Sequence, residues 1–226
     1  MKPNQHAIVK DLVLIGGGHS HVAVLKSFGM RPIPGVRLTL IARDVHTPYS
    51  GMLPGYVAGH YEFDEAHIDL RPLCQFGSVR LFHDSAVRID ATNKQVICAN
   101  RPPVSYDVLS INIGSRPDVS GVPGAKQFTT AVKPINRFVD RWHLMMQRVL
   151  QQNEPQRIAV VGSGAAGVEV LLAIQFRLQQ ELSAQNRQTQ PLEFHLISKS
   201  KRILSAFPRS VSDRFEQILK QRNVKV

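Results

Sequence analysis

Two glycine-rich segments, residues 16–21 and 162–167, each follow a run of apolar residues. The first reads Gly-Gly-Gly-His-Ser-His and the second reads Gly-Ser-Gly-Ala-Ala-Gly. In a G-x-G-x-x-G loop the first glycine permits a tight turn, the second lets the backbone approach a pyrophosphate, and the third allows close packing of helix on strand. The amides that begin the following helix then face the phosphates. A pair of such loops predicts a chain that holds two dinucleotides.

The two loops differ at the third glycine. In the second loop this position is Gly167, and Glu169 follows two residues later. In the first loop His21 stands there, so the argument for close packing of helix on strand is weaker, while the phosphate turn stays intact. A turn without a ligand is the alternative for either loop. The residues predicted to contact a dinucleotide are Gly16, Gly18, His19 and Ser20 in the first loop, and Gly162, Gly164, Ala165, Ala166 and Gly167 in the second.

A ribose-binding acid is expected at the end of the second strand of each unit, about twenty residues after the loop. The first strand of this kind ends in Arg43-Asp44, so Asp44 reaches a ribose only if it is displaced by a residue or two. The second ends in Lys199, with Lys201 and Arg202 close behind and no carboxylate. A cation at this place suits the 2′-phosphate of NADPH better than a free hydroxyl, which favours NADPH over NADH. A solvated turn fits the same lysines equally well.

Two histidines and two cysteines invite other chemistry. His19 and His21 are alternate residues entering a helix and share no face, so no metal site is expected. His19 either contacts a phosphate or ribose or packs at the helix start. Cys74 and Cys98 lack the spacing of a redox dithiol or a zinc site, and we expect both to be buried as small apolar side chains.

The first loop lies inside a predicted β-α-β unit. Residues 11–15 form the continuous apolar run of a buried parallel strand, residues 21–28 a short helix, and residues 36–42 a second strand. Residues 47–56 are too rich in Pro and Gly for a regular element and too apolar for a surface linker, so we expect a packed loop. The further expected elements are a helix over 62–74, strands over 79–82, 85–89 and 95–98 with a hairpin through 90–94, and a strand from 104 that ends in the Gly114-Ser115 turn.

The second loop lies inside another β-α-β unit. The expected elements are an amphipathic helix over 134–152, a strand over 157–161, a helix over 165–180, a polar loop over 183–190, a strand over 192–197, a helix over 209–222 and the start of a strand at 224–226. Because a doubly wound sheet needs more strands than these, we expect the second domain to be incomplete and the chain to be C-terminally truncated.

Composition limits the class of protein. The 226 residues, of which 43% are hydrophobic, suffice for one large or two small packed domains. The net charge of +11 suits phosphate-bearing ligands, and the chain lacks the alternation of aromatic and basic residues of an RNA-binding sheet, so no nucleic-acid partner is expected. The sequence contains no apolar run long enough to span a membrane and no secretory leader. We therefore expect a cytoplasmic protein, with peripheral contact to the inner membrane as the alternative.

Three segments together resemble the pyridine-nucleotide disulfide oxidoreductase superfamily. They are the Gly16 loop, the segment Tyr106-Asp107-x-Leu109-x4-Gly114-Ser115-x-Pro117, and the Gly162-x-Gly164-x2-Gly167-x-Glu169 loop, in the family's order. The sequence of residues 16–21 and 47–55 resembles that of a narrower branch of this superfamily. This branch is the type II NADH dehydrogenase-like flavoprotein module that some bacteria fuse to selenide, water dikinase. The resemblance covers essentially the whole chain and predicts an α/β fold with two Rossmann-like three-layer domains.

The resemblance implies an FAD-binding domain over residues 1–133, a connecting helix over 134–155 and a partial NAD(P)-binding domain over 156–226. It places the flavin ring near Ser50, Gly51, Met52, Gly114 and Ser115, with Arg43, Asp44 and Val87 as further FAD contacts and Lys199 as a contact of NAD(P)H. Glu169 would help to position the nicotinamide. The implied reaction passes a hydride from NADH or NADPH to FAD and then electrons to a quinone or another small acceptor.

Two departures from the family pattern limit what the resemblance implies. The first long helix lacks the cysteine pair of the disulfide-containing members, so electrons should pass from the flavin to an outside acceptor. The chain also ends before the family's return to the flavin domain. A dinucleotide-binding module without turnover, or a fragment of a fusion with selenide, water dikinase, is therefore the alternative. The oligomeric state is not indicated by any motif.

Overall fold

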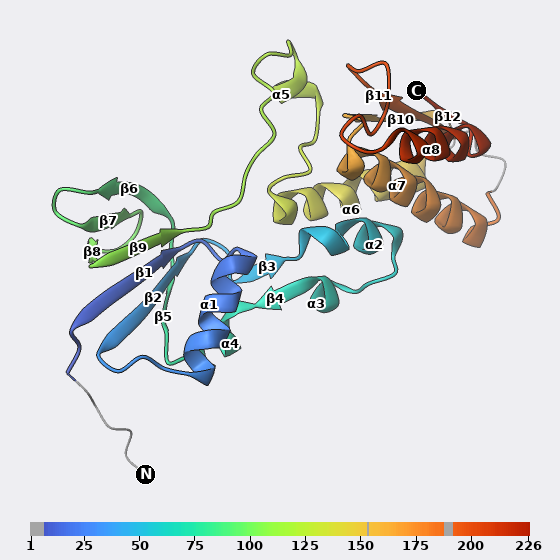
Figure 1. Cartoon of the computed structure of the whole chain (residues 1–226). Coiled ribbons are helices and arrows are strands. Elements are labelled where there is room, and N and C mark those ends of the chain that lie inside the picture. The colour runs from blue at the N-terminus through green and yellow to red at the C-terminus, as the bar shows by residue number, and fades with distance from the viewer. Residues whose placement is uncertain (1–6, 153, 188–191) are drawn as a thin grey trace. The chain divides into compact units, whose positions relative to one another are not determined.

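The computed structural model describes residues 7–152, 154–187 and 192–226, which form two compact units (Figure 1). Unit 1 contains the chain up to Tyr49 together with His67–Asp118, and unit 2 contains Ser50–Ala66 together with Val119–Val226. By these contacts Ser50–Ala66 groups with the second half of the chain rather than with the predicted first domain, and the later boundary lies near residue 118 rather than 133. The assignment of a dinucleotide to each half stays a prediction.

Unit 1 is built on a parallel sheet with the strand order β5-β2-β1-β9. Helix α1 connects β1 to β2, so the first glycine loop lies inside a β-α-β unit as predicted. The bounds of these strands and of the helices that cover them are β1 Lys10–Ile15, β2 Val36–Ala42, β5 Arg80–His83, β9 Val108–Ile111, α1 His19–Met30 and α4 Leu70–Phe76.

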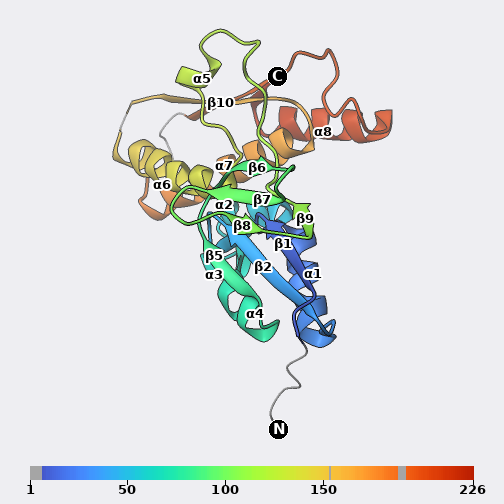
Figure 2. The ribbon, with the colours of Figure 1, turned by 90° about the vertical axis from the view of Figure 1, so that its left-hand side faces the viewer.

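Alternate residues of this sheet enter two different cores. Leu14 and Leu40 pack with α1 and α4 through Leu25 and Leu70. Residues of the opposite parity, among them Val13, pack with β7 of a second, antiparallel sheet. That sheet, seen in Figure 2, has the order β6-β7-β8, with β6 at Ala86–Asp90, β7 at Gln95–Cys98 and β8 at Val104–Ser105. Two covered faces explain why residues 12–15 of β1 and residues 40–42 of β2 are uninterrupted apolar runs.

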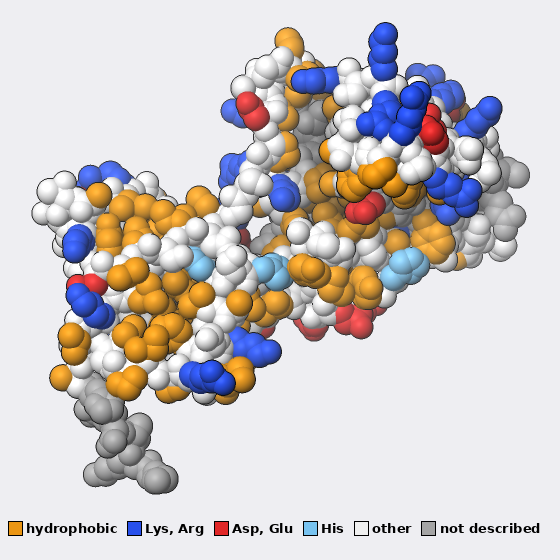
Figure 3. All heavy atoms as spheres, viewed as in Figure 1, with side chains coloured by type: hydrophobic (Ala, Val, Ile, Leu, Met, Phe, Trp, Pro, Cys, Tyr) orange, Lys and Arg blue, Asp and Glu red, His pale blue; other side chains and the backbone are white. Residues whose placement is uncertain are grey.

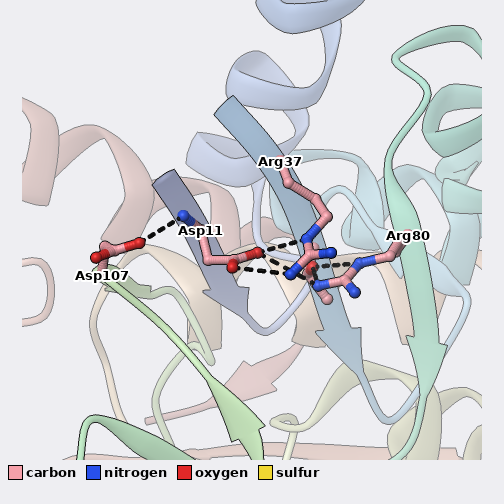
Figure 4. Close-up of polar contacts among 5 residues, drawn as sticks. Asp11, Arg37, Arg80 and Asp107 are labelled. Atoms are coloured by element: carbon pink, nitrogen blue, oxygen red, sulfur yellow. Dashed lines mark hydrogen bonds and ion pairs between the residues drawn. The ribbon is translucent and has the colours of Figure 1, made fainter. Parts of the chain in front are cut away.

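A polar clamp joins the amino ends of the strands in unit 1 (Figure 4). Asp107, just before β9, accepts a hydrogen bond of 2.8 Å from the backbone amide of Asp11, and its own amide donates to the Asp11 carbonyl at 2.9 Å. The Asp11 carboxylate binds Arg37 through bonds of 2.6 and 2.8 Å, and Arg80 lies 3.6 Å from the same carboxylate while it donates to Thr39. Asp107 of the family motif thus holds β1 and β9 together at the edge opposite the glycine loop.

Unit 2 is built on a second parallel sheet, with the order β10-β11-β12. Its main helices pack on one face in a single core that includes Ile158, Leu171, Phe194 and Leu219. The strands are β10 Gln156–Val161, β11 Leu192–Ile197 and β12 Val224–Lys225, and the helices are the 3₁₀ turn η1 Ser50–Met52, α2 Leu53–Ala58, α3 Phe63–Ala66, α5 Ala125–Phe128, α6 Ile135–Gln151, α7 Ala165–Ala184 and α8 Arg209–Gln221.

The other face of this sheet is exposed in the described part of the chain. Along β10 the exposed residues Arg157, Ala159 and Val161 alternate with residues that face the core. On β11, Ile197 lies on the same exposed face, beside Val161. Val161 and Ile197 are 65% and 52% exposed, although parallel sheets are ordinarily covered on both faces.

The structure confirms the α/β class and corrects several predicted elements. The expected loop over 47–56 contains β3 (His46–Pro48), η1 and most of α2. The expected helix over 62–74 is broken by β4 (His67–Asp69), which pairs with β3. The strand expected from residue 104 is two strands, β8 and β9, in different sheets. Helix α7 continues to Ala184, into the expected polar loop over 183–190, of which 188–190 lie outside the described residues.

Basic side chains are spread over both units and are accompanied by few acidic ones (Figure 3). The 28 Lys and Arg residues against 17 Asp and Glu residues account for this surface. Among the described residues no helix has the length and apolarity needed to cross a membrane.

Candidate functional site

The first glycine loop is a tight turn from β1 into α1. Gly16 has φ +88° and donates from its amide to the Ile41 carbonyl at 2.8 Å, which ties the loop to the end of β2. A side chain is strained at this φ, so glycine is required. The amides of Gly17, His19 and Ser20 have no acceptor in the described part of the chain. Such donors at the start of a helix can bind an anionic phosphate.

Asn112, directly after β9, is a loop contact that sequence reasoning missed. A Cβ on Gly16 would lie 2.4 Å from the Asn112 carbonyl oxygen, and a Cβ on Gly18 would lie 2.4 Å from its side-chain oxygen. The Gly18 amide also donates to the Asn112 carbonyl at 3.2 Å. On the other side, a Cβ on Gly17 would lie 2.5 Å from Leu70. The backbone contact makes glycine necessary at Gly16, whereas at Gly17 and Gly18 the side chains of Leu70 and Asn112 would have to shift. The one signal for Asn112 in the sequence was a polar Asn between two apolar isoleucines.

His21 is closely packed, although its place at the third glycine had weakened the sequence argument for close packing. The residue is 2% exposed. Nδ1 lies 2.6 Å from the Gly16 carbonyl oxygen and Nε2 lies 2.9 Å from the Ser110 hydroxyl of β9. Burial lowers the pKa of His21, and the bond to Gly16 opposes this shift. The side chain thus connects α1 to both the loop and the sheet.

The end of β2 places Arg43 and Asp44 beside the first loop, because β2 is the parallel neighbour of β1. The two side chains bind each other, with Arg43 Nε and Nη2 at 3.0 and 2.6 Å from Asp44 Oδ2. His83 Nε2 lies 2.9 Å from the Arg43 carbonyl. Asp44 lies near the carboxyl edge of the sheet, where a ribose-binding acid was predicted, but its carboxylate already binds the Arg43 guanidinium.

The other predicted residues of unit 1 surround the same edge or lie on the antiparallel sheet. His19 is exposed at the first position of α1, with its ring centroid 4.8 Å from that of Tyr49. Gly114, with φ +74° and open space around it, and Ser115 are exposed after β9. Val87, in β6 at a register shift, is 62% exposed. The parallel sheet therefore brings His19 and Gly114 to the edge that carries the first loop.

The second glycine loop has the same form in unit 2. Gly162, with φ +112°, donates from its amide to the Ile197 carbonyl at 2.9 Å. A Cβ on Gly167 would lie 1.8 Å from the Gly162 carbonyl oxygen, so α7 packs on this turn more closely than any side chain allows. A Cβ on Gly164 would meet nothing within 4 Å. Open space in front of a loop whose Ala165 and Ala166 amides have no acceptor among the described residues fits a pyrophosphate.

The loop after β11 is held against the second glycine loop by hydroxyl groups. Ser163 Oγ lies 2.6 Å from Ser198 Oγ, and the Ser163 carbonyl accepts from the Leu204 amide at 2.8 Å. Arg202 is a structural residue of this segment, because its guanidinium binds the Ser205 carbonyl at 2.7 Å and the buried Ser212 hydroxyl at 3.2 Å. The serine pair was not foreseen from the sequence.

Lys199 and Lys201 are exposed beside the second loop, and neither has an ion-pair partner in the described part of the chain. They are therefore the cations available at this edge, since Arg202 is committed to its own loop. Glu169 is exposed on the first turns of α7. Ser50, Gly51 and Met52 form η1 of unit 2.

The cysteines are buried, as predicted. Cys74 packs with Leu25 and Leu70, and burial raises the pKa of its thiol to about 11. Burial likewise raises the pKa of Cys98. Thiols of this kind are poor nucleophiles at neutral pH. Among the described residues no group of three or more His, Cys, Asp or Glu side chains is arranged to hold a metal ion.

Comparisons with known proteins match nearly the whole length of the chain. The family model for pyridine nucleotide-disulphide oxidoreductases matches residues 10–226. The NADH dehydrogenase-like protein YutJ of Bacillus subtilis (strain 168) is 28% identical over 227 residues, which cover 96% of this chain and 57% of that protein.

Two solved structures show the same fold over 96% of this chain. NDH2 from Plasmodium falciparum, in complex with NADH, has a TM-score of 0.80 at 17% identity and is covered to 47%. The sulfide:quinone oxidoreductase of Aquifex aeolicus has a TM-score of 0.70 at 20% identity and is covered to 50%. The chain thus spans about half the length of the relatives that it matches.

Proposed function

The chain belongs to the family of pyridine nucleotide-disulphide oxidoreductases, and we propose that it is an FAD-dependent oxidoreductase which oxidises NAD(P)H and reduces a quinone or another small acceptor. The observation that carries the proposal is the pair of glycine loops. Each lies at the carboxyl edge of its own parallel sheet, and each presents helix-start amides without an acceptor among the described residues. We assign FAD to the loop of unit 1 and NAD(P)H to the loop of unit 2.

Both loops fit their assigned group. In unit 1 the amides of Gly17, His19 and Ser20 would bind the FAD pyrophosphate, while Arg43 and Asp44 lie beside them for the adenosine end. In unit 2 the space in front of Gly164 would admit the pyrophosphate of NAD(P)H. Bound FAD would supply the hydride acceptor and the onward electron carrier, and the chain supplies binding and orientation.

Lys199 and Lys201 support NADPH as the preferred reductant. They are exposed and lie next to the loop on the neighbouring strand end, which is where the adenosine ribose is read in this fold. Each ammonium group would bind the 2′-phosphate by a charge-assisted hydrogen bond. Glu169, exposed near the start of α7, would orient the nicotinamide side.

The buried thiols support direct transfer to an outside acceptor. Neither Cys74 nor Cys98 is exposed enough to form a relay with substrate. The name of the sulfide:quinone oxidoreductase of Aquifex aeolicus favours a quinone as that acceptor. We place the reaction in the cytoplasm, with peripheral contact to the inner membrane where the quinone is lipid-soluble.

The proposal is tested with the purified chain and added FAD. We expect the flavin to stay bound through gel filtration, its visible absorbance to bleach with NADPH under anaerobic conditions, and a water-soluble quinone to restore it. Gly164→Val is the control, because its side chain would occupy the phosphate space: flavin should stay bound but should no longer bleach. A chain that takes up no FAD would contradict the proposal, and loss of both cofactors in the variant would contradict the assignment of loops to units.

A further inference from the structure

His21 occupies the third-glycine position of the first loop without leaving the loop unsupported. Nδ1 lies 2.6 Å from the Gly16 carbonyl oxygen. Because a carbonyl only accepts, Nδ1 carries the proton of this bond. Nε2 of the neutral ring then accepts from the Ser110 hydroxyl, 2.9 Å away. Both ring nitrogens are satisfied inside a site where the side chain is 2% exposed.

The bond to the Gly16 carbonyl also sets the direction of the next amide. In a trans peptide the carbonyl and the following N–H point to opposite sides. Holding the Gly16 oxygen on the buried ring therefore turns the Gly17 N–H away from it. That amide is one of the donors without an acceptor in the described part of the chain.

The second loop shows what the third position does when it is glycine. Gly167 approaches Gly162 so closely that an added Cβ would lie 1.8 Å from the Gly162 carbonyl oxygen. In both loops, then, the third position contacts the carbonyl of the first glycine, by close backbone approach in one and by a ring nitrogen in the other.

We propose that His21 is a positioning residue for the first dinucleotide site, whose Nδ1–H fixes the Gly16 carbonyl and so aims the Gly17 amide at the phosphate of the ligand. This inference rests on the proposed binding of FAD by unit 1. The Ser110 bond has a different role, because it anchors the ring to β9 and does not contact the loop.

Two substitutions separate these roles. In His21→Asn the side-chain amide nitrogen is as many bonds from the backbone as Nδ1, so it can donate to the Gly16 carbonyl but cannot reach Ser110. In His21→Gln the amide nitrogen corresponds to Nε2, so it keeps the Ser110 side and loses the Gly16 bond. Ser110→Ala, the matched control, removes only the anchor.

The measurement is the dissociation constant of FAD for the apoprotein, by quenching of flavin fluorescence, alongside the thermal midpoint of each apoprotein. We expect His21→Asn and Ser110→Ala to bind FAD within about threefold of the wild type, and His21→Gln to bind about tenfold more weakly, which is the loss of one hydrogen bond. The thermal midpoint should fall in all three variants and should not track the affinity.

Equal affinities for His21→Asn and His21→Gln, or affinities that follow the thermal midpoints, would reduce His21 to a packing residue and overturn the inference while FAD binding stands. A wild-type chain that binds no FAD overturns the proposed function and this inference with it.

Discussion

The contact between Gly167 and Gly162 predicts how a single methyl group would disturb the second site. In Gly167→Ala the new Cβ would lie 1.8 Å from the Gly162 carbonyl oxygen, more than 1 Å inside the 3.0 Å that real Cβ contacts keep. The obstacle is backbone, so the start of α7 must move outward. Because backbone cannot move aside as a side-chain end can, the overpacking cost lies in the upper part of its usual range, about 2–3 kcal/mol, and the better helix propensity of alanine offsets about 1 kcal/mol of it.

We therefore expect Gly167→Ala to lose about 1–2 kcal/mol of stability, which for a chain of this size lowers the thermal midpoint by about 2–8 °C. Because the helix-start amides move by about 1 Å, NADPH should bind about 10- to 100-fold more weakly, while FAD affinity stays unchanged. Circular dichroism follows the melting of the apoprotein, and calorimetric titration gives the NADPH affinity.

Gly164→Ala is the matched control for this prediction. Its Cβ would stand in open space at φ −76°, so the apoprotein should melt within about 2 °C of the wild type while NADPH binding is lost to the methyl group in the phosphate space. If Gly167→Ala leaves the melting temperature where Gly164→Ala does, the close contact of α7 on the loop has no energetic consequence and the reasoning is wrong.

Three further outcomes are expected. Replacing Lys199 and Lys201 together by Glu should change the preference for NADPH into a preference for NADH in steady-state kinetics. Lys220→Glu on α8 should leave the preference unchanged. If the double replacement does not change it either, the two lysines are solvated side chains that bind no cofactor. A hydrogen bond from Arg71 lowers the pKa of Asp69 to about 2, so the contribution of this carboxylate to stability is present above pH 4 and is lost as the pH falls from about 4 towards 2. The melting temperature of Asp69→Asn should therefore fall less than that of the wild type over this interval, and an equal fall in both proteins would refute the prediction. Cys74→Ala should retain NADPH oxidation, since a buried thiol takes no part in transfer; abolished turnover in a folded variant would contradict direct transfer.

The sequence predicted the β-α-β units well because their signal is local. The strand bounds 36–42, 95–98 and 192–197 agree with β2, β7 and β11, each of which is a short segment rich in apolar residues between polar or turn residues. The glycine loops were placed correctly for the same reason, since each glycine lies next to the strand that it ends.

Helix α2 was missed because its Pro and Gly suggested a loop. Pro54 lies in the first turn, where its missing N–H is not needed, and Gly59 ends the helix with φ +82°. The same residue types that interrupt a helix in its interior are favourable at its two ends, and only the surrounding contacts decide between these cases.

Contacts between distant segments could not be predicted. Asn112 meets the glycine loop from nearly a hundred residues further along the chain, and Ser163 meets Ser198 across two strands. Asp107 was identified as part of a family motif, but its function as a clamp on the Asp11 amide follows only from the pairing of β1 with β9.

The role of the third position has a consequence for how dinucleotide loops are recognised in other chains. A search pattern that demands glycine at the third position would find the loop of unit 2 and miss the loop of unit 1. In both loops, however, the residue at the third position contacts the carbonyl oxygen of the first glycine. The requirement is a partner for that oxygen, and a donor side chain of suitable length meets it as well as a bare backbone does. Patterns that admit asparagine at this position, or histidine where a serine or threonine is available on the neighbouring strand, should therefore recover loops that the glycine rule excludes.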